Sequence, residues 1–144
     1  MVDVTRIDKI TRNSKAAEKP SYSDFYTNFN VHPQNSRLAK YTNEESVKRS
    51  IRSLILTEKY DRLFQPELGC RIRNLLFENM SPVIAEEIKS TIRETIEIYE
   101  RRARIIDIIV QANESRHSYD IYIYFQVINS VDPVSINITL YRAR

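Results

Sequence analysis

The strongest constraint on this chain is a change in the spacing of its apolar residues near position 100. Before this point, isoleucine recurs every four residues, at positions 84, 88, 92 and 96. This spacing places the four side chains along one face of a helix. Ser81 precedes the pattern as a favourable N-cap residue, and Pro82 suits the first helical turn. The spacing predicts a helix over residues 82–99.

Beyond this helix the apolar spacing changes to two, the period of a half-buried strand. Residues 104–112 are rich in β-branched side chains, and residues 119–128 and 134–141 alternate apolar with polar residues. Short polar links over 113–118 and 129–133 separate these segments. The pattern predicts a three-stranded antiparallel meander with one face packed on helices.

Two further helices are expected before the long one. An apolar stripe that starts at Val47 and continues at i+4, i+7 and i+8 predicts a helix over 43–57. Residues 71–79 predict a short helix with Phe77 facing inward. Between them, Gly69 is the only glycine of the chain and is expected to take a positive φ. The sequence therefore predicts an α+β fold, with two or three helices packed on a small antiparallel sheet.

The N-terminal part, residues 1–42, shows no sustained apolar period. We expect an extended arm over 1–20 and an aromatic strap up to residue 42, followed by a single α+β domain over 43–144. The first 40 residues hold seven of the 22 basic and four of the 19 acidic residues, so the net charge of +3 falls there. A neutral domain lacks the concentrated basic face of a nucleic-acid binder. No apolar run approaches the roughly 20 residues of a membrane span. We therefore expect neither nucleic acid nor a membrane as a partner.

The composition excludes most conventional catalytic sites. The single glycine rules out glycine-rich phosphate loops. One cysteine rules out a Cys-cluster zinc site, and the two histidines, His32 and His117, lie far apart. We therefore expect no cofactor and no metal. Paired carboxylates remain an option, since two of them at a suitable separation can hydrolyse a glycosidic bond. A peptidoglycan hydrolase is thus the alternative function, although helix caps and ion pairs account for most of the glutamates.

The densest charged motif is Glu100-Arg101-Arg102-Ala103-Arg104, where the long helix gives way to the first strand. Arginines near a helix C-terminus complement the helix dipole, so a purely local role is one interpretation. An acid beside several arginines also forms a directional docking site for a polar partner. The candidate partner-binding residues are therefore Glu100, Arg101, Arg102 and Arg104.

The predicted meander also offers a surface for a partner. A three-stranded sheet has two edge strands, and their unpaired main-chain groups can accept another strand. The sequence does not decide which segments lie at the edges, and we favour the C-terminal one. The candidate residues for strand addition are Val134, Ile136, Asn137, Ile138, Thr139, Leu140 and Tyr141.

Three phrases occur in a characteristic order: Phe64-Gln-Pro-Glu-Leu-Gly-Cys70, Leu76-Phe-Glu-Asn-Met-Ser-Pro82 and, after the long helix, Tyr99-Glu100-x-Arg102. Together they resemble the baseplate wedge and sheath-initiator proteins of contractile phage tails, which have relatives in R-type pyocins and in the type VI secretion baseplate. The resemblance covers roughly residues 44–142. The hallmark of that family is Glu-Pro-Arg after the long helix. Here the acid and the final arginine match, and Arg101 stands in place of the proline.

The resemblance implies a small α+β domain in the baseplate wedge, next to the tail tube. It implies that the motif after the long helix contacts the helical core bundle of the wedge, and that the first sheath ring joins the sheet. The implied partners are other baseplate wedge proteins and the tail sheath protein, with tail tube or hub proteins as further neighbours. The implied location is the baseplate of the virion tail, assembled in the host cytoplasm, and the implied role is structural rather than enzymatic.

Overall fold

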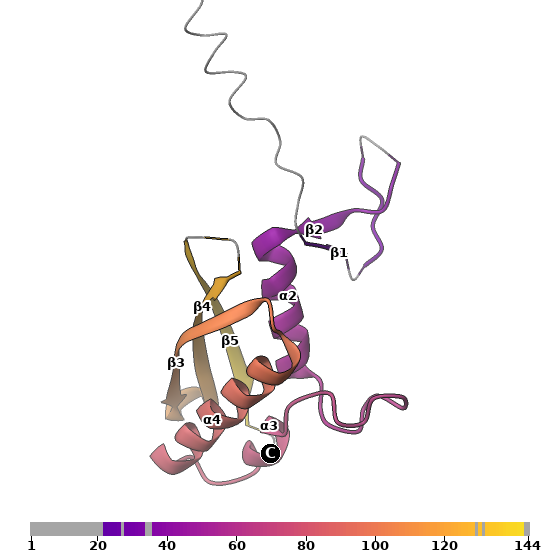
Figure 1. The fold of residues 1–144 in the computed structure, drawn as a ribbon. Helices are drawn as coiled ribbons and strands as arrows, with labels where there is room; N and C mark the ends of the chain where they lie inside the picture. Colours follow the sequence, from indigo (N-terminus) through magenta and orange to yellow (C-terminus); the bar gives the residue numbers. More distant parts are fainter. Residues whose placement is uncertain (1–21, 27, 34–35, 129, 131, 143–144) are drawn as a thin grey trace, which may run out of the picture. The chain divides into compact units, whose positions relative to one another are not determined.

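The computed structural model describes residues 22–26, 28–33, 36–128, 130 and 132–142. Two compact units divide the chain, Met1–Asn43 and Glu44–Arg144 (Figure 1). The extended arm expected over residues 1–20 lies outside the described residues. Among the described helices, none combines the length and the apolar character needed to cross a membrane.

The first unit contains a short antiparallel pair of strands, β1 (Ser23–Phe25) and β2 (Lys40–Thr42). Tyr26 follows β1 and Tyr41 lies in β2, and their rings stack with centroids 4.0 Å apart. Stacked aromatic rings add stabilisation beyond the area they bury. The aromatic segment that the sequence predicts as an irregular strap therefore includes a regular strand pair.

The second unit contains three helices, α2 (Asn43–Leu56), α3 (Ile72–Leu75) and α4 (Pro82–Tyr99). The bounds of α4 match the predicted helix. Ser81 is its N-cap: this residue is extended, and its side chain accepts a hydrogen bond from the Ile84 N–H at 3.3 Å. A hydroxyl in this position satisfies one of the free N–H groups of the first turn.

The short helix differs from its prediction. Helix α3 spans only four residues of the predicted 71–79, and Phe77 is 58% exposed rather than inward. The chain continues beyond α3 in turns, with the Phe77 N–H donating to the Asn74 carbonyl at 3.2 Å. The N–H groups of Phe77 and Glu78 bond three residues back, to Asn74 and Leu75, so turns replace the α-helical bonding pattern beyond α3.

The three C-terminal strands are β3 (Ala103–Asn113), β4 (Ser118–Val127) and β5 (Pro133–Tyr141). They form one antiparallel sheet in the order β3-β4-β5, with a short 3₁₀ turn, Glu114–Arg116, between β3 and β4. This arrangement confirms the predicted meander and the α+β fold. Strand β4 lies at the centre, so β3 and β5 are the two edges of this sheet.

The core lies between the helices and one face of this sheet. In Figure 1, α4 crosses in front of the sheet and α2 lies next to β5. Alternate residues of β4 are buried against the helices, as their spacing predicts; they are Tyr119, Ile121, Ile123, Phe125 and Val127. The helices contribute buried side chains at Val47, Ile51, Leu54, Ile55, Ile84, Ile88, Ile92 and Ile96. The fold is therefore a two-layer sandwich of helices on a sheet.

A β-bulge interrupts the pairing of β3 with β4. The register shifts between Ile105 and Asp107, which leaves Ile106 as the extra residue, 55% exposed. The Asp107 side chain accepts a hydrogen bond from the Ile108 N–H at 2.8 Å. Bulges bend an edge strand and disrupt its ladder, which is one way in which proteins protect edges from unwanted pairing.

Gly69 closes the loop between α2 and α3. Its φ is +134°, as the sequence predicts, and the next residue, Cys70, donates its N–H to the Thr57 carbonyl at 2.8 Å. A Cβ atom at position 69 would lie 2.6 Å from the Thr57 carbonyl oxygen and 2.9 Å from the carbonyl carbon of Glu58. Only glycine therefore fits this position without a shift of the backbone.

We predict that Gly69→Ala destabilises the protein by roughly 2 kcal/mol or more, since it adds both backbone strain and a steric clash. Urea unfolding followed by circular dichroism measures the change. The matched control is Gln65→Ala, at an exposed position of the same loop, which should change stability by less than about 0.5 kcal/mol. Equal stability of the two variants would show that the neck of the loop is not constrained.

Candidate docking sites

Glu100 forms the turn that joins α4 to β3. It is the C-cap of α4, its N–H donates to the Ile96 carbonyl at 2.8 Å, and only 3% of the residue is exposed. The Arg102 guanidinium donates to both carboxylate oxygens, from Nε to Oε1 and from Nη2 to Oε2, each at 2.7 Å. Ser50 of α2 adds a further side-chain hydrogen bond to Glu100. This bidentate pair is the strongest geometry available to arginine and a carboxylate.

Two opposing effects act on the pKa of Glu100. Burial is the largest and raises the pKa, because it penalises the charged form. The hydrogen bonds from Arg102 and Ser50, together with the positive charge of Arg102, lower it. Together these interactions lower the pKa by more than burial raises it, so the pKa of Glu100 lies below its ordinary value of 4.5. Glu100 is therefore ionised at neutral pH and remains bound inside the fold.

The four residues of the charged motif consequently take different positions. Glu100 points into the protein rather than toward a partner, and Arg102 is held against it with its side chain 29% exposed. Arg101 and Arg104 are exposed, and neither has an ion-pair partner among the described residues. The motif thus presents arginines at the surface, and the buried Glu100 carboxylate holds one of them, Arg102, in place.

The hydrogen-bonding direction along the β5 edge follows from its register. Beyond the strand, the Arg142 N–H donates to the His117 carbonyl at 2.8 Å, which continues the pairing of β5 with β4 by one step. Bonded and non-bonded pairs alternate along an antiparallel ladder. The main-chain groups that point away from β4 therefore belong to Ser135, Asn137, Thr139 and Tyr141.

Arg52 supports this assignment. Its Nη2 reaches from α2 and donates to the Asn137 carbonyl at 3.0 Å, which requires that carbonyl to point away from β4. The candidate residues for strand addition divide by face. Val134, Ile136 and Ile138 are buried toward the helices and Leu140 is half-buried, while Asn137, Thr139 and Tyr141 are exposed.

The outward main-chain groups of the opposite edge, β3, follow from the same reasoning. The Ile128 N–H donates to the Arg102 carbonyl at 2.9 Å, beyond the end of β4. Counting from this bond and across the bulge, the outward main-chain groups of β3 belong to Ile108, Val110 and Ala112. The N–H of Ile108 is already taken by the Asp107 side chain. On each edge, therefore, a side chain already bonds one outward main-chain group: Arg52 bonds the Asn137 carbonyl of β5, and Asp107 bonds the Ile108 N–H of β3.

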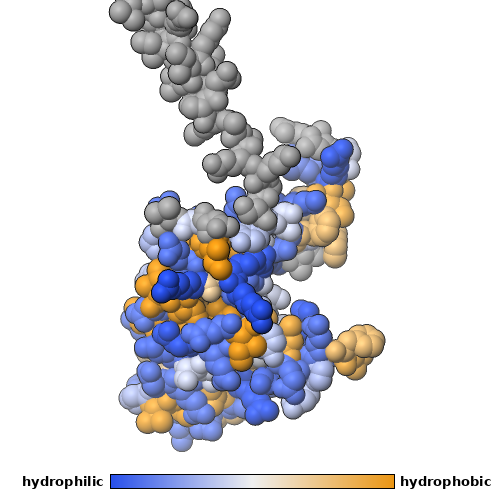
Figure 2. Space-filling view, in the orientation of Figure 1, coloured by the Kyte–Doolittle hydropathy of each residue, from blue (hydrophilic) through white to orange (hydrophobic). Residues whose placement is uncertain are grey.

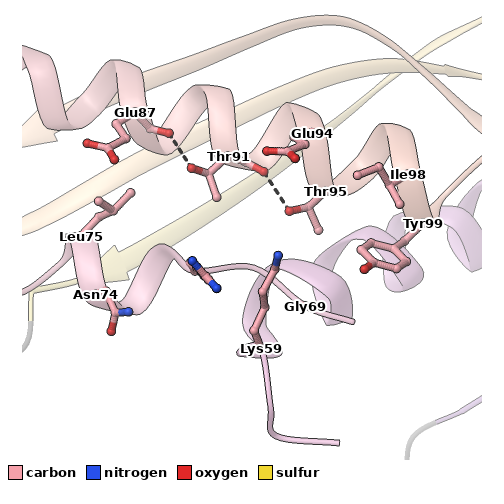
Figure 3. A pocket seen from close by; sticks show the side chains of 11 residues that line it. Lys59, Gly69, Asn74, Leu75, Glu87, Thr91, Glu94, Thr95, Ile98 and Tyr99 are labelled. Carbon is pink, nitrogen blue, oxygen red and sulfur yellow. Dashed lines mark hydrogen bonds between the residues drawn. The ribbon is translucent and has the colours of Figure 1, made fainter. Parts of the chain in front are cut away.

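A surface pocket of about 380 Å³ lies between α4 and the segment over residues 59–75, which includes α3 (Figure 3). Lys59 and Arg71 line it on the loop side, and Glu87 and Glu94 line it on α4. Both glutamates are exposed, whereas a glycosidase needs one carboxyl with a pKa raised by burial beside one that stays ionised. Neither carboxyl group of the pocket is buried.

Other catalytic chemistry finds little support in the described part of the chain. No group of three or more His, Cys, Asp or Glu residues is placed there to hold a metal ion. Cys70 is buried, and its Sγ accepts a hydrogen bond from the Thr95 hydroxyl at 3.4 Å. Burial raises the pKa of this thiol, which disfavours the thiolate form that a nucleophile needs.

A comparison with known protein families identifies the chain. Residues 42–132 match the family model described as "Baseplate wedge protein gp25", which covers the helices and most of the sheet. This chain belongs to the gp25 baseplate wedge family. It is accordingly a baseplate wedge protein of contractile tail systems.

A curated relative agrees with this assignment, and a solved baseplate structure shares the fold. The gp25 baseplate wedge protein of Enterobacteria phage T4 is 33% identical over 89 residues, which cover 62% of this chain and 67% of the T4 protein. A subunit in the baseplate of the anti-feeding prophage has a TM-score of 0.59 at 20% identity, covering 85% of this chain and 86% of that one.

A further fold relative of this gp25-family chain comes from Geobacter sulfurreducens and is provisionally described as a tail lysozyme. Its TM-score is 0.68 at 20% identity, with 72% of this chain and 95% of that one covered. At this identity the likeness shows a shared fold and says nothing about lysozyme activity.

Two side chains that organise the sites of this gp25-family protein were missed in the sequence. Ser50 supports Glu100, and Arg52 caps the Asn137 carbonyl. Both lie on the polar side of the α2 stripe, where serine and arginine are ordinary surface residues. Their partners lie 50 and more positions away, so no local pattern marks them.

Glu100→Gln should reduce the stability at pH 7 by roughly 1.5–3 kcal/mol, because it removes the negative charge that pairs with Arg102 and one of the two oxygens to which Arg102 donates. A pKa lowered by folding stabilises the protein above the ordinary value of 4.5, and this contribution is lost as the pH falls through the folded-state pKa. The difference between wild type and variant should therefore shrink below about pH 4.5.

Urea unfolding at several pH values measures this difference. The control is Glu97→Gln, at an exposed position on α4 one turn before Glu100, which should have little effect at any pH. A stability difference for Glu100→Gln that stays constant from pH 7 to acid would contradict the proposed role of the ionised carboxylate.

Proposed function

We propose that this protein is a structural subunit that docks on the core of the baseplate wedge and templates the first sheath ring by β-strand addition. The observation that carries the proposal is the β5 edge: a strand with one neighbour in its sheet, whose outward main-chain groups are known by position. Family membership supplies the contractile-tail setting.

Strand addition suits the β5 edge for two reasons. Its inward side chains are buried against the helices, so the register of the strand is fixed and presents donors and acceptors at constant spacing. Its outward groups at Ser135, Thr139 and Tyr141 are those that an incoming strand would bond. An extended arm of a sheath subunit is the proposed occupant.

Arg52 gives this edge a protective contact. By binding the Asn137 carbonyl at 3.0 Å, it occupies an acceptor in the middle of the edge, as charged side chains do on many natural edge strands. An exposed arginine–carbonyl contact is weak enough for an incoming N–H to replace it. The edge is therefore partly masked before assembly and open to a strand that brings its own donors.

The charged motif is the proposed contact with the wedge core. Arg101 and Arg104 offer exposed guanidinium groups, and Glu100 orients Arg102 from inside the fold. An acidic or carbonyl-rich helical surface fits such a set of donors. The proposed partners are other wedge proteins at this motif and the tail sheath protein at β5, with tube or hub proteins as further neighbours in the virion tail. Assembly in the host cytoplasm belongs to the same proposal.

We infer that the protein acts without catalysis. Glu87 and Glu94 are the carboxylates of the pocket, and both are exposed on one face of α4. The curated relative at 33% identity is a baseplate wedge protein. A structural role therefore accounts for the fold without the peptidoglycan hydrolase that two carboxylates alone would suggest.

The two sheet edges allow a matched test of strand addition. Thr139→Pro removes an outward N–H from β5, together with the Thr139 hydroxyl that donates to the Asp120 carboxylate at 2.7 Å, and leaves the apolar face intact. Ala112→Pro removes an outward N–H from β3 at an exposed alanine on the face of Ile108. Proline is tolerated at such edge positions. We expect the Thr139→Pro protein to fold and enter the baseplate but to yield tails without sheath, whereas tails with Ala112→Pro carry normal sheaths. Electron microscopy of tails assembled with each variant decides.

Normal sheaths with incorporated Thr139→Pro would overturn the assignment of β5. Loss of sheath with Ala112→Pro alone would move strand addition to β3. Circular dichroism and thermal melting of each purified variant confirm that it is folded before assembly.

Charge reversal tests the wedge contact. Arg104→Glu should strongly reduce incorporation into the baseplate, because a charge-assisted contact contributes about 1.5–3 kcal/mol and reversal adds repulsion. Arg116→Glu, an exposed position in the turn before β4, makes the same change in charge and should leave incorporation unchanged. Incorporation is measured by quantitative immunoblotting of purified tails. Equal incorporation of both variants would exclude Arg104 from the contact.

A further inference from the structure

The loop between α2 and α3 carries two large apolar side chains in water. Leu63 is 92% and Phe64 is 96% exposed. In Figure 1 this loop extends to the right of α4, and Figure 2 shows an apolar protrusion at the same place. We propose that the tip loop, residues 58–69, is a preformed anchor that inserts Leu63 and Phe64 into an apolar pocket of an adjoining protein subunit.

The base of the tip loop is held by a set of main-chain bonds. The Tyr60 N–H donates to the Pro66 carbonyl at 2.8 Å, across the tip. Asp61 and Glu58 bond reciprocally, since the Asp61 N–H donates to the Glu58 carbonyl at 3.2 Å and the Glu58 N–H to the Asp61 carboxylate at 3.1 Å. The tip is thus braced by its own residues, as in compact functional loops.

Two side-chain contacts hold the tip loop, one to the rest of its unit and one across its own base. The Tyr99 hydroxyl donates to the Glu67 carbonyl at 2.7 Å, which ties the loop to the end of α4. At the base of the loop, the Lys59 Nζ atom lies 3.9 Å from the Glu67 Oε2 atom. Because the backbone is already ordered, binding through the tip loses little conformational entropy. This preorganisation distinguishes the tip from an exposed apolar residue on a mobile loop.

Tyr60 stores strain at the base of the tip. Its φ is +75°, a conformation that costs an L-residue stability and that clusters at binding and switch sites. The positive φ reverses the chain just before the tip, so that residues 61–65 project from the surface. The strain therefore serves to present the two apolar side chains.

The charges of the tip loop favour a protein pocket over a lipid surface. Two basic residues, Lys59 and Arg62, face three acidic ones, Glu58, Asp61 and Glu67, so the tip loop carries a net charge of −1. A membrane-binding loop combines apolar residues with an excess of basic ones, which this loop lacks. A polar rim of both signs around an apolar centre is the anatomy of a protein interface.

The small number of residues in the tip also indicates its role. Two side chains are far fewer than the 20–30 residues that each partner of a stable interface typically contributes. They act as the anchor of a larger contact, in the way that a few buried apolar residues dominate many interfaces. The adjoining subunit is thus one that also contacts this chain elsewhere, as neighbours in a baseplate do. The inference depends on the family membership and not on strand addition at β5.

The experiment compares the full-length chain with three variants in tail assembly. The double variant Leu63→Ser/Phe64→Ser should keep its melting temperature, because neither side chain is buried in the fold, and its incorporation into tails should fall roughly 30-fold or more. Phe64→Leu keeps an apolar tip and should retain most of the incorporation. Val83→Ser, at a 73% exposed position on α4, is the matched control and should incorporate normally.

A photocrosslinker identifies the partner directly. With p-benzoylphenylalanine at position 64, irradiation of assembled tails should join this chain to one other tail protein, and the same group at position 83 should not. Wild-type incorporation of the folded double variant would overturn the proposal. So would the absence of a crosslink from position 64, which decides the question if the double variant does not fold.

Vesicles of phosphatidylcholine and phosphatidylglycerol test the competing partner. No cosedimentation of the full-length protein is the expected result, whereas cosedimentation that the double variant abolishes would replace the protein pocket by a membrane. Failure here is distinct from failure of strand addition, since Thr139→Pro is expected to enter the baseplate and lose only the sheath.

Discussion

The ion pair between Glu100 and Arg102 determines where the helical layer ends and the sheet begins. The buried carboxylate stops α4, binds the guanidinium two residues later and receives a hydrogen bond from Ser50 of α2. A buried carboxylate is costly unless it is fully paired, and here both oxygens are. The contact therefore fixes α2, α4 and the first residues of β3 against one another. Every surface proposed for docking is positioned by these elements.

The sheet exposes two edges, and each is modified by a single polar contact. On β5 the Arg52 side chain binds an outward carbonyl, and on β3 the Asp107 side chain binds an outward N–H next to the bulge. The difference has a physical consequence. The arginine is long, flexible and exposed, so it can move aside, whereas Asp107 is held by the adjacent backbone. The bulge and the bonded Ile108 N–H together make β3 the less suitable edge for an added strand, which favours β5 as the edge that accepts one.

Much of the fold could be predicted because it depends on local spacing. The four-residue repeat of isoleucine and the cap at Ser81 define α4, and the two-residue alternation defines β4 and β5. The orientation of Glu100 could not be predicted, because an acid at a helix end is compatible with either solvent or a buried arginine. The choice depends on Ser50, which lies 50 positions earlier in the sequence. The contact of Arg52 with Asn137 spans 85 positions, and the exposure of Phe77 follows from where α3 ends.

The features proposed for binding share one property: each departs from what folding alone would favour. Tyr60 has a positive φ, Leu63 and Phe64 are almost fully exposed, and β5 keeps outward main-chain groups. Natural chains agree with the folding rules at most positions and depart from them at functional sites. The core shows no comparable departure along its isoleucine stripe, where Ile88, Ile92 and Ile96 are completely buried. A rigid core thus holds a strained tip and an incomplete sheet in place until neighbouring subunits complete them.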